Sequence, residues 1–275
     1  MKNYLMKKYL VLITICFVAL AASSQNRTTK QTIELNSTEE LKLLSNLWQQ
    51  NAAEYRALCY QAFNTATMQV DALPKKMRRQ QQLAIITDLD ETILDNSPNE
   101  AQLMKDNKSW NYQSWKQWTD LSAATAVPGA AEFLQYAKSK GITIFYISNR
   151  SVNEVASTLI NLQKLHLPDA DTSHMLFMHD DASKESRRQV VIKNYTVIML
   201  MGDNLNDFSN VFEGKNITDR FTETDNAKDN WGKKFIVLPN ATYGEWENAL
   251  YNYQYNLTPE QRINLLRNLL HGIQQ

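Results

Sequence analysis

The chain has 275 residues, 43% of them hydrophobic, which is enough to bury one substantial core together with a helical accessory region. Basic and acidic residues number 29 each, so the formal net charge is zero. This balance lacks the basic excess that binding to a nucleic acid polymer requires, and it excludes that class of partner.

Residues 1–24 are predicted to be a cleaved signal peptide. Three lysines precede an apolar run, Tyr9–Ala22, and small residues follow it. The alternative is a membrane anchor, but the run is shorter than the roughly 20 residues that a membrane-spanning helix needs. Cleavage would remove three lysines and no acid, leaving 26 basic against 29 acidic residues and a charge near −3. We therefore expect no membrane span and an exported protein, either periplasmic or secreted.

The two cysteines predict no intrachain disulfide. Cys16 lies inside the predicted signal peptide, so that cleavage leaves Cys59 alone. Lipid attachment at Cys16 is the less favoured alternative, since bulky Ile15 precedes it and the cysteine lies in the middle of the apolar run. Outer-membrane attachment is therefore expected less than a free exported protein.

The chain after the signal peptide is predicted to begin with a flexible lead-in, residues 25–36, and an N-terminal helical region, residues 37–82. Apolar residues recur at helical spacing up to about Val70. Pro74 ends that pattern, and the basic run Lys75–Arg79 is predicted to be a solvated entry to the first strand rather than a binding patch.

Residues 83–275 are predicted to form an α/β core. Apolar runs predict five strands, at 83–87, 141–148, 174–178, 195–201 and 234–238. Helical patterns separate them, at 130–139, 152–165 and 183–193. Strands that alternate with helices of this length predict a Rossmann-like parallel sheet with helices on both faces. In such sheets, binding sites lie at the carboxyl ends of the strands.

A cap insertion is predicted near residues 95–127, where the alternation is interrupted. Four aromatic residues lie there in a polar background: Trp110, Tyr112, Trp115 and Trp118. Two interpretations remain open for these rings, namely packing within a small helical cap and stacking against a substrate.

The end of the chain is predicted to be an amphipathic helix. Thr258, Pro259 and Gln261 match an N-cap, a proline in the first turn and a capping box. We expect the apolar residues that follow to dock this helix on the core.

The most informative residues are Asp88 and Asp90, which follow the first predicted strand directly. Because Leu89 separates them, both carboxylates are expected on the same side of the strand end. Two carboxylates brought together repel each other, so that they need a cation, a shared proton or both. A phosphoryl-transfer site with Mg²⁺ and an attacking aspartate would have this pattern.

Polar residues follow two other predicted strands. Ser148 and Asn149 end the second strand, where a hydroxyl and free N–H groups suit phosphate oxygens, although this is also an ordinary helix N-cap. Asp203 and Asp207 follow the fourth strand, at a spacing that would place them on one face of a helix beginning there. Lys184 is the preferred cation for the group of acids.

The ordered set Asp88-Leu89-Asp90-Glu91-Thr92, Ser148, Lys184 and Asp203–Asp207 resembles the four motifs of the haloacid dehalogenase superfamily. Longer strings resemble the bacterial class C acid phosphatases, the lipoprotein-e type of 5′-nucleotidase also called DDDD phosphohydrolases. These strings are Asp88–Pro98, Trp115–Trp118, Pro128–Ala130, Phe145–Arg150, Ser183–Arg188 and Gly202–Phe208. The resemblance covers roughly residues 41–250. It implies the haloacid dehalogenase fold and hydrolysis of small phosphomonoesters, such as nucleoside monophosphates or aryl phosphates.

The resemblance also implies roles for the matching residues. Asp88 would be the nucleophile that forms an aspartyl-phosphate, and Asp90 would be the general acid and then the base for water. Ser148, Asn149 and Lys184 would hold the phosphoryl oxygens, with Lys184 also acting in catalysis.

The cofactor implied by the resemblance is Mg²⁺. Its expected ligands are Asp88, the backbone carbonyl of Asp90, and Asp203, with Asp207 completing the shell or orienting the lysine. A homodimer is left open.

Two other classes of protein are alternatives on the same fold. A non-catalytic storage or binding protein would lack the nucleophile, whereas Asp88 is present. A dehalogenase would lack the second aspartate of the DxD motif, whereas Asp90 is present.

Overall fold

The computed structural model describes residues 41–273. The predicted signal peptide and lead-in lie outside this range, so their predictions stay untested. Within residues 41–273, no helix is both long enough and apolar enough to cross a bilayer.

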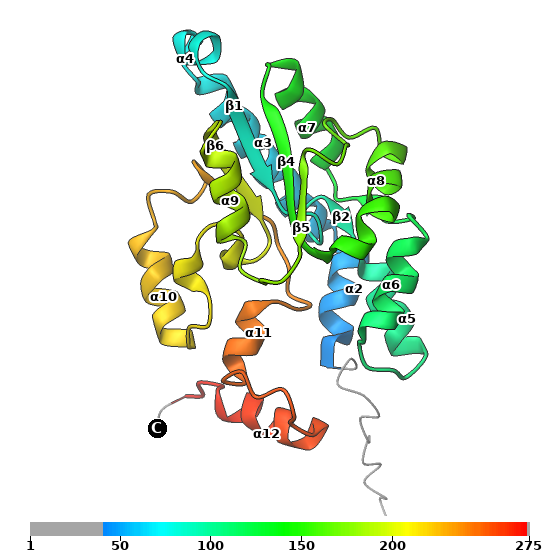
Figure 1. Ribbon diagram of the computed structural model, residues 1–275. Helices are drawn as coiled ribbons and strands as arrows, with labels where there is room; N and C mark the ends of the chain where they lie inside the picture. Colours follow the sequence, from blue (N-terminus) through cyan, green and yellow to red (C-terminus); the bar gives the residue numbers. More distant parts are fainter. Residues whose placement is uncertain (1–40, 274–275) are drawn as a thin grey trace, which may run out of the picture. The chain divides into compact units, whose positions relative to one another are not determined.

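The core is a five-stranded sheet in the order β5-β4-β1-β6-β7, in which every neighbouring pair is parallel (Figure 1). The five strands agree with the five predicted from the sequence, and the α/β fold class is confirmed. Their bounds are β1 (Leu83–Thr87), β4 (Thr143–Ser151), β5 (Met175–Met178), β6 (Thr196–Gly202) and β7 (Phe235–Val237).

Strand β1 lies at the centre of the sheet and is buried along its whole length. Successive side chains point to opposite faces, so that Ile85 packs in one hydrophobic cluster and Ile86 in another. The larger cluster draws on helices α3 (Ala53–Ala72), α7 (Ala130–Ser139) and α8 (Val155–Lys164). The smaller one lies under α9 (Glu185–Ile192) on the other face.

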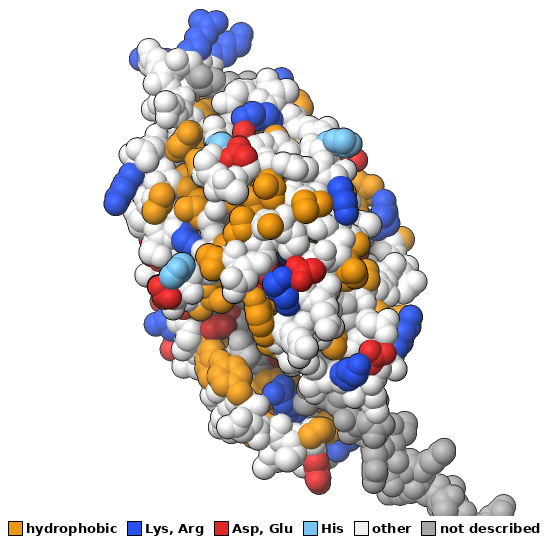
Figure 2. Space-filling model, turned by 45° about the vertical axis from the view of Figure 1, so that its right-hand side comes forward, with side chains coloured by type: hydrophobic (Ala, Val, Ile, Leu, Met, Phe, Trp, Pro, Cys, Tyr) orange, Lys and Arg blue, Asp and Glu red, His pale blue; other side chains and the backbone are white. Residues whose placement is uncertain are grey.

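The predicted N-terminal helical region forms three helices: α2 (Leu43–Asn51), α3 and the short α4 (Lys75–Gln80). Helix α3 is part of the main core, since Cys59 and Phe63 are buried in the same cluster as Phe133 of α7. The basic run was predicted to be a strand entry, but it forms α4. Figure 2 shows basic side chains gathered at this end of the sheet, where they are solvated.

The cap insertion contains two helices, α5 (Ser97–Lys105) and α6 (Tyr112–Asp120). Its base is closed by antiparallel pairing of β2 (Leu94–Asp95) with β3 (Thr125–Ala126). Helix α5 packs against α2, and α6 packs against α8, so the cap is supported on two sides.

The C-terminal helix forms as predicted, but it does not pack on the core as we expected. Helix α12 (Pro259–Asn268) has the predicted capping box at Thr258, but none of its residues is buried. It therefore does not dock deeply on the core, because its apolar residues remain partly or largely exposed to solvent. Two further helices that the sequence patterns did not predict precede it: α10 (Ile217–Asn226) and α11 (Glu245–Leu250).

Candidate active site

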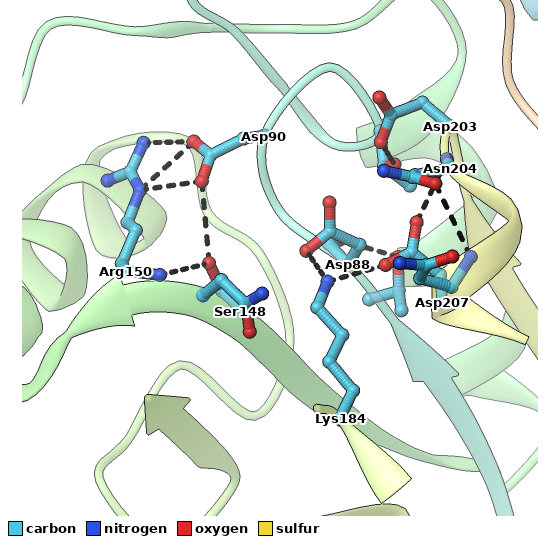
Figure 3. Close-up of polar contacts among 12 residues, drawn as sticks. Asp88, Asp90, Ser148, Arg150, Lys184, Asp203, Asn204 and Asp207 are labelled. Atoms are coloured by element: carbon cyan, nitrogen blue, oxygen red, sulfur yellow. Dashed lines mark hydrogen bonds and ion pairs between the residues drawn. The ribbon is translucent and has the colours of Figure 1, made fainter. Parts of the chain in front are cut away.

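The predicted acidic residues meet at the carboxyl edge of the sheet (Figure 3). Asp88 follows β1, and its backbone N–H donates to the carbonyl of Met201 in β6, which fixes the two strand ends side by side. Asp203 follows β6, and Asp207 ends the 3₁₀ helix η3 (Leu205–Asp207). Parallel strands thus bring together residues more than a hundred positions apart in the sequence.

Lys184 lies between two of these carboxylates at the start of α9. Its Nζ is 2.5 Å from Oδ1 of Asp88 and 2.6 Å from Oδ1 of Asp207, and all three side chains are almost completely buried. The other carboxylate oxygen of Asp88 points away from the lysine (Figure 3). The predicted cation of the site is therefore in direct contact with the predicted nucleophile.

The cluster carries more negative charge than Lys184 can balance. Burial raises the pKa of Asp88 well above its ordinary value, and repulsion from the other carboxylates opposes the attraction of the lysine. Burial and then repulsion by Asp207 raise the pKa of Asp203 to about 7. For Lys184, burial alone would lower the pKa, but Asp207 and Asp88 hold it above its ordinary value. An additional cation would relieve this repulsion.

The loop after β6 places Asp203 and Asp207 without the α-helix that their spacing predicted. Oδ2 of Asp207 accepts the backbone N–H of Asn204 at 3.0 Å, which closes a capping box on η3. Gly202 is required for this fold of the loop, because a Cβ at that position would overlap the Asp207 carboxyl group. The sequence pattern alone does not predict this role for Gly202.

The carboxyl group of Asp90 is turned away from the other three acids. Arg150 donates to both of its oxygens, with Nη2 2.7 Å from Oδ1 and Nε 3.2 Å from Oδ2. Asn96 Nδ2 also donates to Oδ1, at 2.8 Å. The structure thus brings Asp90 to the site but not into the acidic cluster.

The sequence motifs do not mark Arg150 as a functional residue. Its side chain is only 1% exposed, and Nη1 donates to the Thr158 hydroxyl at 2.9 Å. Its guanidinium also lies 5.5 Å from the ring centre of Trp115 in the cap. Its position at the end of β4, two residues after Ser148, was the available signal.

Ser148 and Asn149, the two predicted phosphate-binding residues at this strand end, differ in exposure and in hydrogen-bond partners. Ser148 is fully buried, and its hydroxyl accepts the N–H of Arg150 at 3.0 Å while lying 3.4 Å from Oδ2 of Asp90. Asn149 is exposed and lines the site cavity, where its side-chain oxygen accepts from Arg187 at 2.6 Å.

A cavity of about 740 Å³ opens over the acidic cluster and reaches the cap. Of the four predicted stacking residues, Trp110 and Trp115 line it, whereas Tyr112 and Trp118 are not among its described lining residues. Trp118 instead donates from Nε1 to Asn96 at 2.8 Å and packs against the main core. This ring therefore has a packing role, and it joins the cap to the main core.

Glu91, the residue after Asp90 in the DxDET motif, also has a defined structural role. It is 1% exposed, with a left-handed φ of 56°, and it accepts the N–H of Asn96 at 2.9 Å and the hydroxyl of Tyr243. Gln49 of α2 donates to it at 3.3 Å. Glu91 therefore ties the loop after β1 to two distant segments of the chain.

The cluster fits a hard divalent cation. Carboxylate oxygens of Asp88, Asp203 and Asp207 all lie within 4.8 Å of one another, and Mg²⁺ and similar ions prefer such oxygen ligands. The Asp90 side chain does not belong to this group, so a metal role for Asp90 would have to use its backbone carbonyl.

Comparisons with known proteins agree with this geometry. Residues 3–246 match the family described as HAD superfamily, subfamily IIIB (Acid phosphatase). The chain is similar to the Class C acid phosphatase from Bacillus anthracis, at 38% identity and a TM-score of 0.81 over 86% of this chain and 99% of that chain. The Bacillus anthracis class C acid phosphatase with tungstate bound matches at 37% identity and a TM-score of 0.81, over 87% of this chain and 100% of that one.

Proposed function

Since the chain belongs to the acid phosphatases of HAD subfamily IIIB and is a phosphomonoester hydrolase, we propose that it is an exported, Mg²⁺-dependent 5′-nucleotidase. The observation that carries this proposal is the contact of Asp88 with Lys184 inside a cluster of acids that fits a divalent cation. An aspartate, a lysine and a metal at one strand edge suit attack on a phosphoryl group.

In the first proposed step, a carboxylate oxygen of Asp88 attacks phosphorus, and the bond from phosphorus to the ester oxygen breaks. Asp90 gives a proton to the departing oxygen, so that a neutral alcohol leaves. Lys184 stabilises the negative charge on the phosphoryl oxygens and holds Asp88 in place. The products of this step are the alcohol and an aspartyl-phosphate at Asp88.

In the second proposed step, water attacks the aspartyl-phosphate. Asp90, now ionised, takes a proton from the water, and inorganic phosphate leaves as Asp88 is regenerated. Asp90 is suited to face both the alcohol and the water, because it lines the cavity while Arg150 fixes its orientation.

The proposed metal site consists of the Asp88 and Asp203 side chains and the Asp90 backbone carbonyl. Asp207 either completes it or orients Lys184, with which it already shares a bond of 2.6 Å. When bound, Mg²⁺ would supply the positive charge that the cluster lacks.

The proposed substrates are nucleoside monophosphates and aryl phosphates. The cavity is large enough for a nucleotide, and Trp110 and Trp115 offer rings against which a base can stack. The tungstate bound by the Bacillus anthracis phosphatase supports an oxyanion site here, since tungstate is a tetrahedral anion like phosphate.

Export is proposed from the N-terminal sequence. The lysines, apolar run and small residues of 1–24 favour a signal peptide and a periplasmic or secreted location. Fractionation of cells that produce the full chain, with N-terminal sequencing of the purified protein, would test both cleavage and location.

The central experiment is hydrolysis of p-nitrophenyl phosphate and of a panel of nucleoside monophosphates, with Mg²⁺ and after removal of metal with EDTA. Asp88→Asn should abolish turnover of every substrate, because an amide is a poor nucleophile. Asp225→Asn, an exposed aspartate on α10, is the matched control and should retain full activity. Full activity of Asp88→Asn would overturn the mechanism, and activity insensitive to EDTA would overturn the metal requirement.

A further inference from the structure

A second hollow adjoins the active-site cavity at the C-terminal end of the chain. It has a volume of about 390 Å³ and lies between α2, the segment joining α5 to α6, and the region of α11 and α12, which Figure 1 places beyond the carboxyl edge of the sheet. We call it the annex. The residues that line both the annex and the active-site cavity are Lys42, Trp110, Glu247, Asn248 and Tyr255. The annex and the active-site cavity are therefore contiguous, because these five side chains line both.

The residues that line the annex alone have a distinct chemistry. Tyr251 and Tyr253 provide aromatic surface, and Arg262 of α12 provides a guanidinium group. These residues follow residue 246, where the match to the family ends. The family's shared catalytic motifs therefore do not account for the annex.

Arg262 is the group in the annex that is suited to hold an anion. Its guanidinium lies 4.7 Å from the ring centre of Tyr251, which fixes the side chain against an aromatic face. Arg262 forms no ion pair with a carboxylate within residues 41–273, and its polar side-chain contact there is with Tyr251. A guanidinium without a carboxylate partner can bind an anion that enters the annex.

Charge and shape narrow the class of ligand. Lys42 and Arg262 line the annex together with one described acid, Glu247, and Lys42 also lies 3.7 Å from Glu100. Arg262 is therefore the lining cation that has no carboxylate partner within residues 41–273. A guanidinium recognises phosphate oxygens through paired hydrogen bonds, and the tyrosines suit a sugar or a planar ring. A substrate whose phosphoryl group lies at Asp88 could reach the annex only with the part of the molecule that is remote from that phosphoryl group.

We propose that the annex binds the second phosphate group of a doubly phosphorylated nucleotide whose other phosphate, a monoester, is hydrolysed at Asp88. This inference rests on the proposed phosphatase function and names a substrate class for it. A nucleoside monophosphate would fill the catalytic cavity alone, whereas a nucleotide with a remote phosphate or diphosphate would also contact Arg262.

The test compares adenosine 5′-monophosphate with adenosine 3′,5′-bisphosphate and with adenosine 2′,5′-bisphosphate, each of which has the 5′-monoester that the proposed function hydrolyses. In the wild-type protein, KM for 5′-phosphate release should be about tenfold lower for at least one doubly phosphorylated substrate, as expected for one charge-assisted contact. Arg262→Gln should remove this preference, and Arg262→Lys should restore part of it. Arg267→Gln, exposed on the same helix, is the matched control and should keep the preference.

Because each variant is judged by the ratios among its own three KM values, a fraction of misfolded protein does not change the comparison. An equal KM for all three substrates in the wild type, or a preference that survives Arg262→Gln, would overturn the annex proposal while the phosphatase remains active. Absence of hydrolysis of every phosphomonoester, p-nitrophenyl phosphate included, would instead overturn the proposed function and with it this inference.

Discussion

The guanidinium of Arg150 binds both oxygens of the Asp90 carboxylate, with the shortest contact 2.7 Å long. A planar guanidinium that makes paired bonds fixes both the position and the plane of its partner. Arg150 is fixed in turn by Thr158 of α8 and by the ring of Trp115 in α6. The orientation of the proposed general acid is therefore coupled to the packing of the cap.

We expect Arg150→Ala to lower kcat/KM by about 100-fold for an alkyl phosphate such as glycerol 2-phosphate, because protonation of a poor leaving group needs a well-placed acid. The loss should be about tenfold smaller for p-nitrophenyl phosphate, whose leaving group departs without a proton. Arg150→Lys should recover little, since it cannot make the paired bonds. An equal loss for both substrates would indicate a structural role only.

The contact of Lys184 with two buried carboxylates predicts a change in stability that depends on metal. Lys184→Met leaves the acids without their cation, and the free energy of unfolding of the metal-free protein should fall by about 3–5 kcal/mol. Urea denaturation with and without Mg²⁺ measures this, and the ion should restore part of the loss. Lys193→Met, at the exposed end of the same helix, should change stability by less than about 0.5 kcal/mol. Similar losses in the two variants would contradict the importance of the buried pair.

We expect a substitution at Gly202 to weaken metal binding, although this residue has no side chain that could bind the ion. In Gly202→Ala, the new methyl group overlaps the Asp207 carboxyl group and displaces it from Lys184. We expect the Mg²⁺ concentration for half-maximal activity to rise about tenfold or more, which titration of activity with Mg²⁺ would measure. Gly272→Ala is a suitable control, because a Cβ there meets nothing within 4 Å. An unchanged Mg²⁺ requirement in Gly202→Ala would show that the loop can accommodate the methyl group.

Glu91 predicts a dependence of stability on pH. Burial, and then repulsion by Asp90, raise its pKa to about 8 from an ordinary value of 4.5. The folded state therefore favours protonated Glu91, so its contribution is complete below pH 4.5 and is lost as the pH rises towards 8. Relative to Glu91→Gln, the metal-free wild type should lose up to about 1.4 kcal/mol of unfolding free energy per pH unit in this window. Urea denaturation at pH 5, 6, 7 and 8 measures the difference, and parallel curves would contradict it.

The elements that the sequence predicted well are those whose physical cause is local. Strand β1 is apolar along its length, and the helix over Ala130–Ser139 has a regular apolar period, so both were predicted at their observed bounds. Asp88, Asp203 and Asp207 were predicted to meet because parallel strand ends share one edge, and they do.

The features that were missed depend on contacts between distant segments. No local pattern shows that Arg150 reaches Asp90, 60 positions earlier, or that Tyr243 reaches Glu91, 152 positions earlier. The loop after β6 was predicted as a helix because the spacing of two acids was considered alone. The capping box of Asn204 and Asp207 favours a 3₁₀ turn there instead. Helix α12 has an apolar pattern, but a pattern alone does not supply a surface to bury it.

The bonds around Glu91 have a consequence for the order in which the protein folds. Gln49 reaches Glu91 from near the start of the described chain, and Tyr243 reaches it from near the end, while the hydroxyl of Thr242 lies 3.5 Å from Gln49. A chain that has been synthesised only as far as Asp207 holds all four acids, yet it lacks the segment that secures the loop carrying Asp88. The native contacts around the catalytic centre are therefore complete only in a chain that includes residue 243, and we expect a chain that ends before this residue to lack phosphatase activity.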